Sequence, residues 1–249
     1  MINLKTTFVS LLLLTLTASI QAKELKTIET DDATVEVRIF PASGDTLLLG
    51  FACDEGKSII EEKTAASLAQ DGVEVWMPDM LSAFMLPNVQ SSLPQISTAA
   101  LLAIIETAVE TGKKVYLVAS GPHTQLLLRS AGQWEASNKP PLAGAILIFP
   151  RLIKGDPDPG KAPEYVDAVG TTRLPIILLE GGRTPNRWGV NTLSQALGKG
   201  GSKVVAKVIP EIRGHLFDSK DTNRTEDVVT SQMAGLIKVS LFYIKEYEQ

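Results

Sequence analysis

Residues 114–122 read KVYLVASGP, an apolar run that stops at Ser-Gly-Pro. The centre of the run, Val115–Ala119, has the continuous apolar character of a strand covered on both faces of a sheet. Pro122 suits the first turn of a helix, and the residues after it favour a helix over Pro122–Ala131. The stretch therefore predicts a buried strand that runs directly into a helix.

The same alternation of strand and helix extends in both directions from this stretch. We expect strands at Val35–Phe40, Thr46–Ala52, Val73–Met77, Val115–Ala119, Ala143–Phe149, Ile176–Glu180 and Val204–Ile209. We expect helices at Ile59–Gln70, Ser97–Thr111, Pro122–Ala131, Val190–Leu197 and Thr225–Tyr247. Strands that alternate with helices of this length form a mostly parallel sheet with helices on both faces. The predicted fold class is therefore α/β, with about seven to eight strands.

The first two expected strands are too close in sequence for a helix to lie between them. Gly44-Asp45 separates them and favours a turn, so we expect Val35–Phe40 and Thr46–Ala52 to form an antiparallel hairpin at the start of the sheet. No repeat or change of composition divides the rest of the chain. Residues 23–249 are therefore expected to form a single domain.

The composition is that of an ordinary globular protein, with 44% hydrophobic and 21% charged residues and a formal net charge of −4. No basic stripe is present to neutralise phosphates, which argues against nucleic acid as a partner, and there is no polybasic membrane anchor. Residues 1–22 combine Lys5, a short apolar run at Phe8–Leu16 and small residues before Lys23. This run is too short to span a bilayer. It predicts a cleaved signal peptide and a periplasmic or secreted protein.

Ligand sites of parallel α/β sheets lie at the carboxyl ends of the strands. That rule selects a small set of side chains: Cys53, Asp54, Asp79, Ser120, Gly121, His123, Arg151, Glu180, Arg183, Thr184, Arg213 and His215. Cys53 is the single cysteine and follows an apolar run, so we expect a small core residue rather than half of a disulfide. No spacing motif supports a metal site or a dinucleotide site, and no cofactor is expected.

Four strings of sequence, taken in order, resemble the α/β-hydrolase fold family: Leu68–Asp79, Lys114–Pro122, Leu174–Gly181 and Gly214-His215. In that family the first string forms a helix–Gly–strand–Pro-Asp passage, and the second forms the strand that enters the nucleophile elbow. The third forms the strand before the catalytic acid, and the fourth lies in the loop that carries the catalytic His. The resemblance covers nearly all of residues 23–249. It implies the family's fold and a site at the carboxyl edge of the sheet. The short stretch Arg151–Arg173 is rich in Pro and Gly and predicts a surface loop rather than a cap domain.

The elbow departs from the family pattern Gly-x-Ser-x-Gly, in which a strained turn lifts the Ser above the sheet. Aligning the strands places Gly121 at the nucleophile position and Ser120 one residue before it. A shift by one residue promotes Ser120 to nucleophile, but Val118 and Pro122 then occupy positions that sterics require to be small. This steric argument favours the first register, which contains no nucleophile, and the second register stays open.

The other triad positions are also incomplete. The family's Asp usually lies a few residues past Gly181, where this chain has Thr184, which cannot stabilise an imidazolium. Glu180 is a candidate for a relocated acid, although an ion pair with Arg183 is its default interpretation. His215 matches the family's His and is either a general base or ligand contact, or a structural loop residue.

His123 lies at the first turn of the expected helix, where the macrodipole disfavours its cationic form. It is either a ligand contact or a residue exposed to water.

Two functions follow from these features. The first is an exported α/β-hydrolase-fold protein without the usual Ser and Asp of the triad, which binds a small molecule or a protein partner. Its ligand-binding residues would be Gly121, His123, Arg183 and Arg213, and free N–H groups at the start of the helix would favour an anion. The alternative is an esterase-like serine hydrolase that uses Ser120, His215 and Glu180. The steric conflict at the elbow favours the first function.

Overall fold

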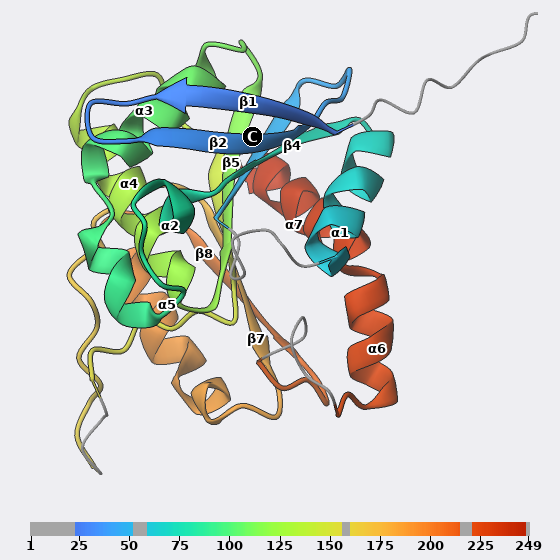
Figure 1. Ribbon diagram of the computed structural model, residues 1–249. Helices are drawn as coiled ribbons and strands as arrows, with labels where there is room; N and C mark the ends of the chain where they lie inside the picture. The colour runs from blue at the N-terminus through green and yellow to red at the C-terminus, as the bar shows by residue number, and fades with distance from the viewer. Residues whose placement is uncertain (1–22, 52–58, 156–159, 215–220, 248–249) are drawn as a thin grey trace, which may run out of the picture.

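The computed structural model describes residues 23–51, 59–155, 160–214 and 221–247. One eight-stranded sheet lies at its centre, with helices on both faces (Figure 1). The strands are β1 (Glu24–Glu29), β2 (Thr34–Phe40), β3 (Thr46–Phe51), β4 (Val73–Pro78), β5 (Lys114–Ser120), β6 (Gly144–Ile148), β7 (Ile176–Gly181) and β8 (Val204–Ile209). The helices are α1 (Ile59–Gln70), α2 (Met80–Ala83), α3 (Thr98–Val109), α4 (Thr124–Ala136), α5 (Val190–Gly198), α6 (Arg224–Ser231) and α7 (Met233–Tyr247). Three short 3₁₀ segments are η1 (Gln90–Gln95), η2 (Gly121–His123) and η3 (Pro185–Gly189).

The strands follow the order β1-β2-β4-β3-β5-β6-β7-β8 across the sheet. β1 is antiparallel to β2, and β2 is antiparallel to β4. Every other neighbouring pair is parallel. The α/β class, the mostly parallel sheet and its antiparallel start are therefore confirmed.

The first hairpin, however, is formed by β1 and β2, and the expected direct pairing of Val35–Phe40 with Thr46–Ala52 is wrong. β4 lies between these two strands, because Val75 pairs with Phe40 of β2 on one side and with Leu48 of β3 on the other. β4 is buried along its whole length and so needs a partner strand on each side. β1 was not expected, since most of its residues are exposed and it carries no apolar run.

The core consists of two layers, one on each face of the sheet. α3, α4 and α5 cover one face, together with Leu117 and Leu178 of the sheet. α1 and α7 cover the other face and pack against Tyr116 and Ile177 (Figure 1). Neighbouring strand residues alternate between the two layers, as the pleat of a strand requires. The run Val115–Ala119, expected to be covered on both faces, is buried except for Val118, which is half-buried.

Two helix boundaries bear on the sequence analysis. α1 coincides with the expected helix Ile59–Gln70, which ends before Gly72, a residue with a φ of +85°. The expected helix Thr225–Tyr247 is divided at Gln232 into α6 and α7. Asn223 begins α6 with a reciprocal capping box to Glu226.

No helix in the described part of the chain is long and apolar enough to cross a membrane. The expected signal peptide, residues 1–22, lies outside the described residues.

The central position of β5 predicts a large cost for truncating its core side chain. Leu117 is fully buried between α3 and α4 and the sheet, so Leu117→Ala should lower the free energy of unfolding by about 2–5 kcal/mol. The matched control is Leu25→Ala on β1, where the side chain is 63% exposed and the cost should stay below about 0.5 kcal/mol. Urea titration followed by circular dichroism measures both, and equal costs would contradict the assigned strand order.

Candidate functional site

The turn between β5 and α4 is the structural counterpart of the elbow. Ser120 ends β5 in an extended conformation, with a φ of −121° and a ψ of 155°. Gly121 follows with a φ of +54°, in the left-handed region that disfavours side chains with a Cβ. The carbonyl oxygen of Gly121 accepts hydrogen bonds from the Thr124 hydroxyl (2.7 Å) and from the Arg151 amide (3.1 Å). The sharp change of direction thus falls on Gly121, and Ser120 still belongs to the strand.

The residues after Gly121 continue the turn into the helix. Pro122 is the second residue of η2, in the first turn, where its missing N–H costs nothing. His123 is only 5% exposed, so the interpretation of this residue as a water-exposed side chain is wrong. It is covered because η2 folds back onto η1 before α4 begins.

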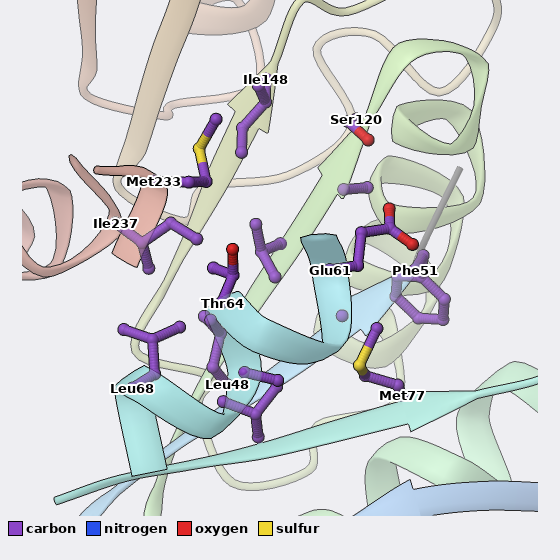
Figure 2. A pocket seen from close by; sticks show the side chains of 15 residues that line it. Leu48, Phe51, Glu61, Thr64, Leu68, Met77, Ser120, Ile148, Met233 and Ile237 are labelled. Atoms are coloured by element: carbon purple, nitrogen blue, oxygen red, sulfur yellow. The ribbon is translucent and has the colours of Figure 1, made fainter. Parts of the chain in front are cut away.

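Ser120 lines a small apolar pocket on the face of the sheet that α1 and α7 cover. The pocket has a volume of about 80 Å³. Figure 2 shows Ser120 on its strand behind α1, with Met233 and Ile237 entering from α7. Two further polar side chains, Glu61 and Thr64, reach the same pocket from α1. The arrangement offers an apolar space with hydroxyl groups and a carboxyl group at its wall.

The sequence analysis did not select Glu61 or Thr64. A signal was present, because positions 61, 64, 65 and 68 lie on one face of the helix at the spacing of a core-facing stripe. Ala65 and Leu68 fill that stripe as core residues. Polar residues at two positions of an otherwise buried face indicate a cavity beneath it.

Glu180 lies on the other face of the sheet. Side chains alternate between the two faces along β7. Ile177 and Leu179 pack on the side of α7. Ile176 and Leu178 pack on the side of α5, and Glu180 continues that series. Ser120 and Glu180 are therefore separated by the sheet itself. The structure does not bring these two candidate catalytic residues into one site.

Glu180 is 2% exposed, and its partners are neutral donors. Its Oε1 accepts hydrogen bonds from the Gly181 amide (2.8 Å) and from the Thr184 hydroxyl (2.9 Å). Burial raises the pKa of Glu180, and these two hydrogen bonds offset part of that rise. Arg183 is exposed, and no ion pair between Arg183 and Glu180 occurs in the described structure. Thr184 takes the place expected for Arg183, because its hydroxyl reaches back across the tight turn.

Arg213 has a structural partner. Its Nε and one terminal nitrogen donate to the two carboxylate oxygens of Glu226, at 2.9 and 2.7 Å. The same carboxylate accepts from the Arg213 and Asn223 amides. These donors lower the pKa of Glu226 to about 2 and raise the pKa of Arg213. The pair anchors the start of α6 and holds the Arg213 guanidinium against Glu226.

Other candidates are structural or lie elsewhere. Asp79 caps α2 by accepting a hydrogen bond from the Ser82 amide. Cys53, Asp54 and His215 lie outside the described residues, so the relation of Ser120 to His215 remains a prediction. Within the described ranges, no group of three or more His, Cys, Asp or Glu side chains could hold a metal ion.

No protein-family model matches the chain, and no curated protein matches it at a significant level. Solved structures match it over most of its length. A dienelactone hydrolase from Anabaena variabilis is 14% identical with a TM-score of 0.61, over 86% of this chain and 95% of that chain. Esterase 2 of Thermogutta terrifontis, phosphorylated by paraoxon, is 14% identical with a TM-score of 0.60, over 89% and 95%. A proline iminopeptidase from Mycobacterium smegmatis is 9% identical with a TM-score of 0.58, over 91% and 100%.

Identities this low establish the fold alone. The chain has the α/β-hydrolase fold, which it shares with esterases, lipases and peptidases. This confirms the fold that the four sequence strings imply.

The positive φ of Gly121 predicts that this position does not tolerate a Cβ. Gly121→Ala should lower the free energy of unfolding by about 1–2 kcal/mol, because an L-residue is strained in the left-handed region. Gly198→Ala is the matched control: Gly198 ends α5, and open space surrounds the position of its missing Cβ. There the exchange should be neutral or stabilising, since Ala favours helical backbone. Thermal unfolding of both variants measures the difference, and a harmless Gly121→Ala would contradict the turn geometry.

Proposed function

We propose that this chain is a non-catalytic binding protein built on the α/β-hydrolase fold. The observation that carries the proposal is the φ of +54° at Gly121, at the strand-to-helix turn where enzymes of this fold place the nucleophile. A glycine at that position offers no hydroxyl or thiol. The extended backbone of Ser120 supports the register in which Ser120 precedes the nucleophile position.

The placement of the remaining groups supports the same proposal. A triad needs its base within hydrogen-bond reach of both the nucleophile and the acid. Ser120 faces α1 and α7, whereas Glu180 faces α5 on the opposite side of the sheet. A base that activates Ser120 would therefore have to extend over the carboxyl edge of the sheet to reach Glu180. The esterase-like alternative therefore has its candidate acid, Glu180, on the face of the sheet opposite its nucleophile.

The pocket beside Ser120 is the proposed ligand site. Its walls are mainly apolar side chains from β3, β5, α1 and α7, and its volume of about 80 Å³ suits a short aliphatic group. The Ser120 and Thr64 hydroxyls offer hydrogen bonds to a polar end of such a ligand. A small apolar pocket of this kind favours a small molecule over a protein partner.

Reaction with active-site probes tests the absence of catalysis. A fluorophosphonate should not label the protein, and a p-nitrophenyl ester should release no burst of product, because no activated nucleophile is present at the turn. Intact-protein mass spectrometry measures the labelling, with a catalytically active α/β-hydrolase as the positive control. Stoichiometric labelling that disappears in Ser120→Ala would overturn the proposal and establish the serine hydrolase.

Export is part of the proposal and has its own test. The charge and apolar run of residues 1–22 support removal of a signal peptide during export to the periplasm or medium. Mass spectrometry of the protein purified from its native host should give an N-terminus at Lys23 or within a few residues of it. A mature protein that retains Met1 would contradict this part of the proposal while leaving the test of catalysis unaffected.

A further inference from the structure

A second pocket lies on the opposite face of the sheet from Ser120, where β6 and β7 end and α5 begins. It has a volume of about 740 Å³. Glu180 lines it from the end of β7, Tyr165 from the loop after β6, and Asn186 from η3. None of its described lining residues is shared with the pocket beside Ser120. It is therefore a separate feature, independent of the proposed function of the elbow.

The carboxyl group of Glu180 is held in one orientation at this pocket. Both of its hydrogen bonds, from the Gly181 amide and the Thr184 hydroxyl, reach Oε1. Oε2 accepts no hydrogen bond from the described residues, although only 2% of Glu180 is exposed to solvent. The described residues thus fix the carboxyl group through one oxygen and leave the other open to a further hydrogen-bond donor.

Among the described residues, no cation pairs directly with the Glu180 carboxyl group. Glu180 takes part in no ion pair with the described residues, and its two donors are neutral. A buried carboxylate without a cation is unfavourable, and a cationic group that enters beside it removes that cost. Burial raises the pKa of Glu180, as expected for a carboxyl group without a paired cation.

The rest of the pocket is suited to an apolar body. Leu152, Val190 and Leu193 are buried side chains that line it, and Tyr165 adds a half-buried ring.

We propose that this pocket binds an organic cation, a protonated primary amine on a compact apolar or aromatic body. The ammonium group donates to Oε2 of Glu180, and the body packs against Leu152 and Leu193. A charge-assisted hydrogen bond of this kind is stronger than one between neutral groups. It therefore distinguishes an amine from an alcohol of the same shape.

Arg151 also lines the pocket and carries the opposite charge. Its side chain is exposed, so solvent screens it, whereas Glu180 is buried and screened much less. The ligand charge is therefore set by Glu180. A preference for anions would instead indicate that Arg151 dominates the site.

Three probes of the same shape test the proposal: benzylammonium, benzyl alcohol and benzoate. They are titrated at pH 7 into the ¹⁵N-labelled protein, residues 23–249, and followed by amide chemical shifts. Benzylammonium should shift the amides around Glu180, Asn186 and Val190, with an affinity about tenfold or more above that of benzyl alcohol. Glu180→Gln, an isosteric change, should reduce the amine to the affinity of the alcohol. Ser120→Ala, the control at the elbow pocket, should leave amine binding unchanged.

Every other outcome overturns the inference. Equal binding of amine and alcohol, tighter binding of benzoate, or shifts confined to α1 and α7 would each show that Glu180 does not select a cation here. If Glu180→Gln fails to fold, the comparison of the three probes on the unmodified protein still decides the matter. Phosphonate labelling at Ser120 would overturn the proposed function without affecting this result.

Discussion

Successive side chains of a strand point to opposite faces of a sheet, and this constraint decides what the carboxyl edge of this protein can do. β5 and β7 are both covered on two faces, so each of their residues belongs to one helix layer or the other. Ser120 falls in the layer of α1 and α7, and Glu180 falls in the layer of α3, α4 and α5. A change of side chain cannot bring them together, because only a shift of register by one residue would reverse a strand's faces. The pleat of the strands therefore explains why the pockets of Ser120 and Glu180 lie on opposite faces of the sheet.

The turn at Gly121 has a structural role that survives without a nucleophile. A residue with a side chain is strained at a φ of +54°, and such strain is retained where function requires it. Glycine removes the strain, and the turn persists because its carbonyl holds Thr124 at the start of α4 and the Arg151 amide after β6. These contacts join two neighbouring strands to the helix. Selection for the fold alone is enough to keep the shape of the elbow.

The sequence predicted what depends on local pattern and missed what depends on distant partners. All seven expected strands are present, and Ile59–Gln70 is a helix with those bounds, because apolar periodicity and a terminal Gly are local signals. β1 was missed because an exposed edge strand needs no apolar run. The pairing of β2 with β4 was missed because it depends on β4, a distant strand that is buried along its whole length and needs a partner on each side. At the site, the sequence identified Ser120, Gly121 and Glu180 as candidates. It did not show which face of the sheet the Ser120 and Glu180 side chains occupy, because that depends on how each strand is placed in the sheet.

The described part of the chain buries three glutamates, and their surroundings differ in one respect. Glu226 faces Arg213, and Glu74 accepts from Lys113 at 2.7 Å and from the indole of Trp76 at 2.6 Å. Each therefore has a cation that offsets the cost of removing its charge from water. Glu180 has only an amide and a hydroxyl, and a hydrophobic residue at the same strand end would avoid the cost altogether. Of the three, Glu180 alone lines a pocket among those described. The missing positive charge and the open space beside the carboxyl group thus occur at the same residue, as expected if the cation arrives with a ligand.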